Sequence, residues 1–293
     1  MAKWTTFPFA GDYNFDAEGV KKQWARLHAG DLEPLPDDPK LLQAWAHFHN
    51  GDFYQSMRMG LDLGLAGLNV ANKAACIYAT YLEEQEAIRL ALFTEAAERA
   101  ETQIKQQPDN INAYYWRAYA LSRYSQGISV AKALAQGLGN KIKTDLEQVI
   151  QREPRHVDAY ITLGSFHAEV IDKVGSLIGA MAYGASKNAG LGLFNQALRL
   201  NVASAFGMLE YAHAMLMLDG EKMLTEANRL YQLAACAQPM DAMERLAASP
   251  GLRAQTGSRI PAPTGHKLPV PQTKHYWPVQ PSRHNPHNHP SAA

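Results

Sequence analysis

Apolar side chains recur at every third or fourth position along most of this chain, the spacing that places them on one face of an α-helix. From about Lys40 to Leu246 the pattern continues without a convincing β-strand alternation of more than four residues. Short polar turns interrupt it at residues 50–52, 108–110, 154–156 and 219–220. The pattern predicts an all-α protein whose helices are joined by short turns.

Two strips of the chain nearly repeat each other. Ala133-Leu-Ala-Gln-Gly137 and Ala180-Met-Ala-Tyr-Gly184 each run on into similar helical sequence. Internal duplication of this kind is typical of solenoids, because one helical hairpin cannot bury its apolar face alone and stacks on its copies. We therefore predict an α-solenoid of four to five helical hairpins over residues 40–246.

Large and small residues alternate where the two helices of a hairpin should meet. Tyr160 follows Pro154 by six residues, and Gly164 comes one turn later; Phe194 and Ala197 are the facing pair on the second helix. Small residues at such positions let two helices approach closely. The residues expected to pack the hairpins are Tyr160, Gly164, Ala197, Ala212, Ala227, Tyr231, Ala234 and Pro239.

Two hairpins carry ten to fifteen extra residues between their helices, Gly127–Asn140 and Asp172–Asn188. Both inserts are low in charge and rich in Gly, Ala and Ser, whereas a surface loop normally carries more charge. We expect the inserts to pack inward and to line an apolar cavity. Its expected lining is Leu177, Ile178, Met181 and Tyr183.

The hairpin residues, and the turn Gly51-Asp-Phe53, resemble tetratricopeptide repeats, although Val202 stands where that family usually has proline. With the stretch Leu163–Gly175 and the small-residue inserts, the chain looks like a group of bacterial helical-repeat proteins similar to the T-component of TRAP transporters. A weaker likeness is to the regulators of microtubule dynamics. The resemblance covers residues 40–246 and implies a rigid scaffold that binds a partner protein and holds an apolar ligand in a pore.

The formal net charge is zero, but its distribution is uneven. Residues 1–244 carry 22 basic and 28 acidic groups, and the six remaining Lys and Arg follow without any acid. An acidic body disfavours binding to nucleic-acid phosphates, which depends on a basic face. The mild negative charge leaves protein or apolar partners as the expected ligands.

The only cysteines, Cys76 and Cys236, lie in apolar helical patterns, which favours buried thiols and a reducing compartment. No stretch has the length and apolarity of a membrane span, and the first residues lack a signal-peptide pattern. The T-component is a periplasmic lipoprotein, whereas this chain shows no signal-peptide pattern. The resemblance therefore implies the scaffold and its cavity but not the transport role. We expect a cytoplasmic protein that does not insert into a membrane.

Aromatic residues crowd into 114–124 more densely than hairpin packing requires. Tyr115 and Tyr119, with Arg117 and Arg123 nearby, are candidates to face the concave groove, where aromatic and Arg side chains carry much binding energy. The alternative is that these rings fill the core beside small partner helices.

His167, Glu169 and Asp172 share one predicted helix, but the five-residue step from His167 to Asp172 turns their side chains to different faces. Metal binding would need further ligands, and no nucleophile is paired with a base. We therefore expect His167 to be a packed structural residue. No catalytic residue, cofactor or metal is predicted.

The two ends differ in composition from the repeats. Residues 1–39 read as an irregular lead, ending in the Pro-rich stretch 34–39. Residues 247–293 hold nine of the sixteen prolines, no acid, and His284, His287 and His289, which predicts a disordered tail or a reading-frame change after Leu246.

The leading hypothesis is a non-enzymatic scaffold that binds a partner protein through its concave face. The alternative is an accessory subunit of a transport system holding a lipid-like molecule. The sequence names neither partner nor ligand, and it leaves homo-oligomer formation open.

Overall fold

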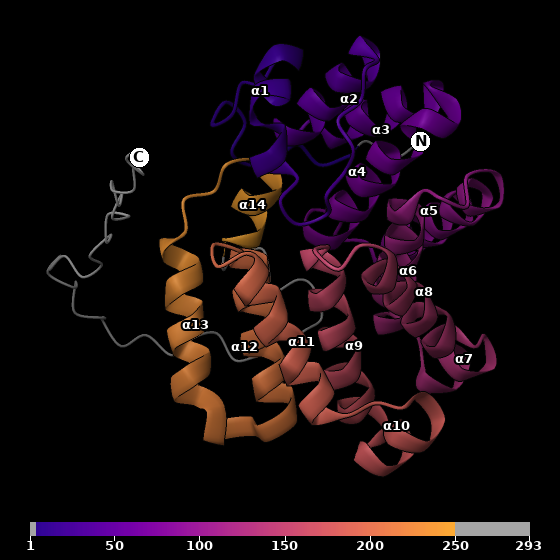
Figure 1. Cartoon of the computed structure of the whole chain (residues 1–293), viewed down its shortest axis with the longest axis vertical. Coiled ribbons are helices and arrows are strands. Elements are labelled where there is room, and N and C mark those ends of the chain that lie inside the picture. The colour runs from indigo at the N-terminus through magenta and orange to yellow at the C-terminus, as the bar shows by residue number, and fades with distance from the viewer. Residues whose placement is uncertain (1–3, 250–293) are drawn as a thin grey trace, which may run out of the picture. The chain divides into compact units, whose positions relative to one another are not determined.

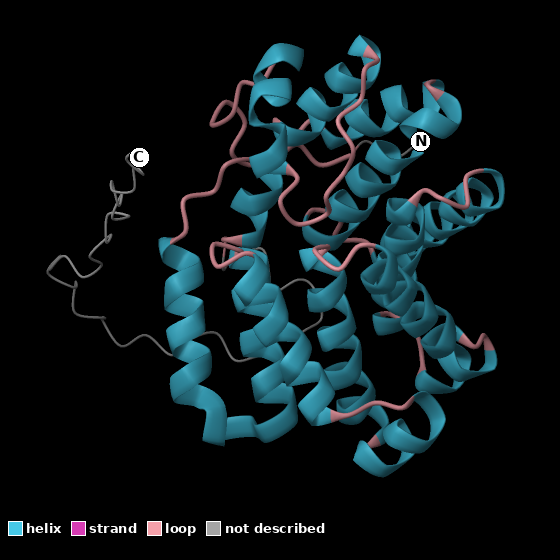
Figure 2. Ribbon diagram, in the orientation of Figure 1, coloured by secondary structure: helices cyan, strands magenta, loops and turns pink. Residues whose placement is uncertain are grey.

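The computed structural model describes residues 4–249, all within one folded unit. In this range every regular element is a helix, as Figure 2 shows, and the all-α prediction is confirmed. The proposed disorder of the tail, residues 247–293 with their three histidines, lies outside the described range except for Ala247, the last residue of α14, and the two residues after it.

Most of the helices form five antiparallel pairs that follow one another along the chain (Figure 1). The second helix of each pair packs on the first helix of the next, so the predicted stacking of helical hairpins is confirmed. The pairs are α2 (Pro39–His49) with α3 (Phe53–Asp62), α4 (Leu68–Tyr81) with α5 (Glu86–Gln106), α6 (Ile111–Gln126) with α8 (Leu138–Arg152), α9 (Val157–Val174) with α11 (Lys187–Leu200), and α12 (Ala205–Asp219) with α13 (Leu224–Cys236).

Successive hairpins repeat the same local contacts. The Tyr114 hydroxyl donates to the carbonyl of Pro108, and the Tyr160 hydroxyl donates to the carbonyl of Pro154, both at 3.2 Å and both across six residues. The side chains of Asn110, His156 and Ser204 cap α6, α9 and α12 by accepting a backbone N–H three residues on. The repeat therefore extends to individual hydrogen bonds.

Small residues hold the hairpins close, as expected. A Cβ added to Gly164 would lie 2.8 Å from the Phe194 ring, so α9 and α11 pack more closely than any larger residue allows. Tyr160 and Tyr231 are only partly buried, and Pro239 follows α13 and accepts a hydrogen bond from the Tyr13 hydroxyl. The buried small residues at the predicted packing positions are Gly164, Ala197, Ala212, Ala227 and Ala234.

The inserts form the short helices α7 (Val130–Ala135) and α10 (Ser176–Tyr183), and the expectation that they pack inward is wrong. No residue of α7 is buried, and in α10 only Gly179 is. Helices of six and eight residues present too little surface to bury one face against the core and enclose a cavity as well. The duplicated strips nevertheless share a conformation, because Gly137 and Gly184 both end a helical turn with φ near +60°.

The lead is not irregular throughout. Asp16 caps α1 (Ala17–Leu27), whose buried Val20 and Trp24 lie on one face. After the last hairpin, α14 (Ala242–Ala247) returns to contact α2, α4 and α12. Both end segments therefore belong to the folded body, because each buries apolar side chains against the first hairpins.

Candidate functional site

The first helices of the last four hairpins, α4, α6, α9 and α12, lie in succession, and we call the surface they share the inner face. Its first row is polar: Asn69, Asn112 and Asp158 each stand two residues after the N-cap of their helix. All three are buried. Equivalent positions in stacked repeats lie side by side, so these side chains form a continuous row.

The chain covers this row with its own residues 28–33. The Glu33 carboxylate accepts hydrogen bonds from Asn69 Nδ2 at 2.9 and 3.0 Å and from Asn112 Nδ2 at 2.5 Å. Asp31 pairs with Lys73 at 2.6 Å, and the Gly30 carbonyl accepts the Asp158 N–H at 3.1 Å. The segment therefore occupies the inner face of three successive helices.

Burial sets the charge states of the row and of the segment 28–33 that covers it. It raises the pKa of Glu33 and that of Asp158 to about 7, and it lowers the pKa of His28 to about 4. Burial also works to raise the pKa of Asp31, but Lys73 and His28 outweigh it and hold that pKa well below its ordinary value. The Asp31–Lys73 pair therefore stays ionised where the segment 28–33 covers the row.

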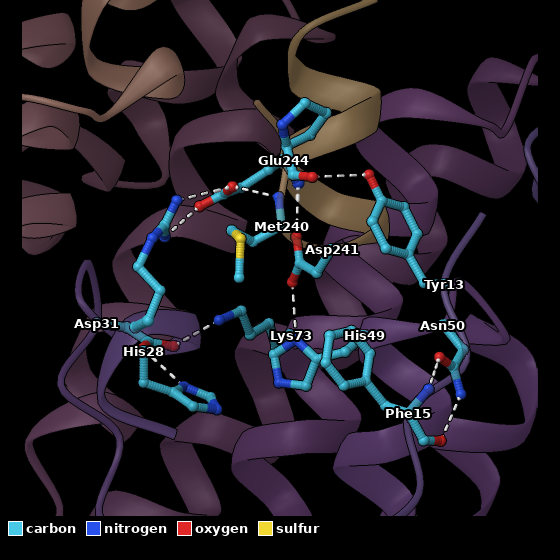
Figure 3. A network of polar contacts seen from close by, with 12 residues as sticks. Tyr13, Phe15, His28, Asp31, His49, Asn50, Lys73, Met240, Asp241 and Glu244 are labelled. Carbon is cyan, nitrogen blue, oxygen red and sulfur yellow. Dashed lines mark hydrogen bonds and ion pairs between the residues drawn. The ribbon is translucent and has the colours of Figure 1, made fainter. Parts of the chain in front are cut away.

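A second polar network ties α14 to α1 and α2 (Figure 3). His49 Nδ1 lies 2.7 Å from Asp241 Oδ2, and Arg26 donates to both oxygens of Glu244 at 2.7 and 3.1 Å. His28–Asp31 is a similar imidazole–carboxylate pair at 2.9 Å. Both imidazoles are almost fully buried, so the two pairs lie inside the folded body.

Further along the inner face a pocket remains between α6, α9 and α12. It has about 240 Å³ of empty space, part of which is open to solvent. Its polar groups occupy matching repeat positions: Arg123 and Glu169 each stand thirteen residues after their N-cap. The lining residues are Tyr119, Ser122, Arg123, Gln126, Thr162, Ser165, Glu169, Phe206 and Glu210.

Charged groups meet inside this pocket. Arg123 NH2 lies 3.2 Å from Glu210 Oε1, and its guanidinium stacks 5.2 Å from the Tyr119 ring centre. Ser165 donates to the other Glu210 oxygen at 3.2 Å, and Gln126 Nε2 donates to Glu169 at 2.6 Å. Burial works to raise the pKa of Glu210, but Arg123 holds it below its ordinary value, whereas the pKa of Glu169 is raised by burial.

Two of the four predicted partner-binding residues belong to this pocket, namely Tyr119 and Arg123. Tyr115 is 1% exposed and packs against His156, so it cannot contact a partner. Arg117 points to the hairpin interior and pairs with Asp145 and Glu101. These two assignments are corrected for different reasons. Tyr115 shares a helix face with Tyr119 but is covered by His156, whereas Arg117 faces another side of α6.

The predicted apolar cavity is also corrected. Leu177, Ile178 and Met181 are 73%, 58% and 81% exposed, so they cover the outside of α10 and enclose no space. Only Tyr183 turns inward, where its ring lies against Gly139.

His167 Nδ1 accepts the Ser186 N–H at 3.2 Å beneath the second insert, which is the structural role expected for it. Within residues 4–249 no group of His, Cys, Asp and Glu side chains is arranged to hold a metal ion. No sequence motif singles out Gln126, Ser165 or Glu210, although their positions relative to the N-caps are readable once the repeats are aligned.

No family model matches the chain, and no curated protein matches it. Among the described helices none has both the length and the apolar character needed to cross a bilayer. The function must therefore be argued from the inner face itself.

Proposed function

We propose that this chain is a non-enzymatic, cytoplasmic helical-repeat scaffold that binds a partner protein at the pocket on its inner face. The observation that carries the proposal is that Arg123, Glu169 and Glu210 gather at an opening between three hairpins. Packing of the hairpins does not need them there, because small and apolar residues already supply it. Placing three charged groups at partial burial costs desolvation, which a binding role would justify.

The covered part of the inner face supports the same use. The segment 28–33 is held there by asparagine side chains, a lysine and one backbone hydrogen bond. Such contacts suit a short peptide segment, as in the inner surfaces that solenoids use for binding. The pocket continues the same face where the chain's own segment ends.

The repeated Tyr–Pro hydrogen bonds favour the resemblance to tetratricopeptide repeats. The two cysteines are unpaired, which fits a reducing compartment; Cys76 is buried as expected, but Cys236 is exposed. The transport-subunit alternative depends on an apolar cavity among the insert residues. Because three of those four residues are exposed, no observation favours it over the scaffold.

Photocrosslinking in the native cell tests the proposal. A benzophenone amino acid replaces Phe206, which lines the pocket, or Leu233, which is exposed on α13. We expect one discrete protein adduct from position 206 and none from position 233. Adding Glu210→Arg should remove the adduct while the circular dichroism spectrum stays helical. Equal adducts from both positions, or none from 206, would contradict the proposal.

A further inference from the structure

The hydrogen-bonding groups of the pocket are unevenly satisfied. Arg123 is engaged by Glu210 at 3.2 Å, by Gln126 Oε1 at 3.4 Å and by the face of Tyr119. Glu210 also accepts from Ser165. Glu169, by contrast, accepts only from the neutral amide of Gln126. Glu169 therefore has spare acceptor capacity, and the ring face and carboxylate around Arg123 fix the position of its guanidinium.

The charges are unequal as well. One guanidinium faces two carboxylates, so the pocket lacks one positive charge when both glutamates are ionised. A further cation, Lys173, stands one turn along α9 from Glu169 and acts on its charge, but its Nζ is held by the Ser125 carbonyl at 3.3 Å. His213 also lies near Glu210 and helps to lower its pKa. A ligand that brings one positive charge to Glu169 would complete the balance.

The space restricts the size of that cation. The enclosed part of the pocket has room for about one water-sized group, and the rest opens to solvent. An ammonium group has this size and offers only donors, whereas a carboxylate, a phosphate or a guanidinium is larger. A long flexible stem could reach inward from the open side.

We propose that the pocket accepts the ammonium group of a lysine side chain on the partner protein, with Glu169 as its main acceptor. This inference rests on the proposed function and specifies its chemistry. The Lys stem would lie along Phe206 at the pocket wall, where apolar ring surface suits methylene groups. Arg123 keeps Glu210 ionised and in place without entering the ammonium position.

The experiment uses the full chain and three capped peptides, Ac-Gly-Ser-Lys-Ser-Gly-amide and the versions with norleucine or glutamate in place of lysine. Backbone amide NMR shifts are followed during titration. We expect the lysine peptide to shift the amide signals of the pocket residues, with a dissociation constant of about 1 mM. This corresponds to a binding free energy of about −4 kcal/mol. The norleucine and glutamate peptides should leave them unchanged. Glu169→Gln should weaken binding at least tenfold, and the exposed control Glu226→Gln should not.

A second pair of variants tests the electrostatic reasoning. Arg123→Gln and Lys173→Met each remove a neighbouring positive charge, so each should strengthen binding of the lysine peptide severalfold. Lys173 is exposed, so its variant remains informative if Arg123→Gln does not fold. Weaker binding by Lys173→Met would overturn the proposal.

The proposal is also overturned if the glutamate peptide shifts the pocket and the lysine peptide does not, because Arg123 would then be the recognition group. Shifts from neither peptide would mean that the pocket holds only water, and would overturn it too. The adduct at position 206 reports on the proposed function separately, so loss of the ammonium site and loss of partner binding are distinguishable.

Discussion

Gly164 and Gly192 show how the same residue type has opposite roles within one hairpin. A Cβ on Gly164 would meet the ring of Phe194 at 2.8 to 3.1 Å, while one on Gly192 would meet nothing within 4 Å. Neither has a positive φ, so backbone freedom is not the reason for either glycine. Space alone distinguishes them.

We predict that Gly164→Ala destabilises the protein by about 1–3 kcal/mol, because the buried ring cannot move aside and overpacking outweighs the better helix propensity of alanine. Gly192→Ala, on α11, should instead stabilise by about 0.5–1 kcal/mol. Urea unfolding of both variants measures the difference. Equal effects would show that the close approach of α9 and α11 does not limit residue size.

A second prediction for a single residue concerns Glu33 and the pH dependence of the free energy of unfolding. Its pKa in the fold is raised to about 7, above the unfolded value of about 4.5, so the folded state binds the extra proton between these values. Its contribution to stability is therefore present at low pH and is lost as pH rises from about 4.5 to 7. His28, with a pKa lowered to about 4, loses stability in the opposite direction, as pH falls from 6.5 to 4.

Asp158, whose pKa is also raised to about 7, adds to the effect of Glu33, and His156, with a pKa lowered to about 4, adds to that of His28. The wild-type curve therefore sums opposing effects, and a variant is needed to isolate Glu33. Glu33→Gln removes one titration, so its stability relative to wild type should rise between pH 4.5 and 8, by up to about 3 kcal/mol. Urea unfolding of the wild type and Glu33→Gln at pH 4.5 and pH 8 measures this difference. The exposed variant Glu147→Gln is the control. A pH-independent difference would mean that Glu33 stays ionised throughout.

At the scale of helices, hydrophobic periodicity was sufficient to predict the hairpins, because burial of one apolar face is what makes a helix part of a stacked pair. The inserts were misjudged for the same reason. Small apolar residues predict close packing only when a partner surface exists, and α10 reaches the body through Gly179 and Tyr183 alone. The lead was misjudged because Val20 and Trp24 are too few to stand out in a polar helix.

The candidate site was only half predictable. Tyr119 and Arg123 were found by composition, but Glu169 and Glu210 come from two other hairpins and meet Arg123 only in three dimensions. The covering of the inner face by residues 28–33 depends on contacts across up to 128 positions of sequence, such as Gly30 with Asp158, and no local pattern encodes them.

Exposure of α10 makes a direct prediction about that element. The double variant Leu177→Ser with Met181→Ser should change the free energy of unfolding by less than about 0.5 kcal/mol for each substitution, because both side chains are already in water. Phe194→Ala, at a fully buried position, should cost about 3–5 kcal/mol. A large loss from the double variant would indicate that α10 packs against something in solution.

At the scale of the whole folded body, α14 joins the end of the repeat series to its beginning. In an open solenoid each hairpin contacts only its neighbours, so disturbance at one end stays there. Here α14 contacts α2 and α4 as well as α12, and Glu244 pairs with Arg26 on α1. The last turn of the fold is thus energetically part of the first hairpins.

Leu246→Ala tests this closure. Leu246 is fully buried, so the variant should lose about 2–5 kcal/mol. The test is where in the fold the variant acts. Amide hydrogen exchange should accelerate in α14, α1 and α2 more than in α13. This would hold although α13 directly precedes α14 in sequence and α1 lies more than 200 residues away. Arg26→Gln should give the same pattern weakly, since that ion pair is partly exposed and contributes at most about 1 kcal/mol. Faster exchange confined to α12 and α13 would instead mean that the repeats behave as an open series, with α14 only resting on the first hairpins.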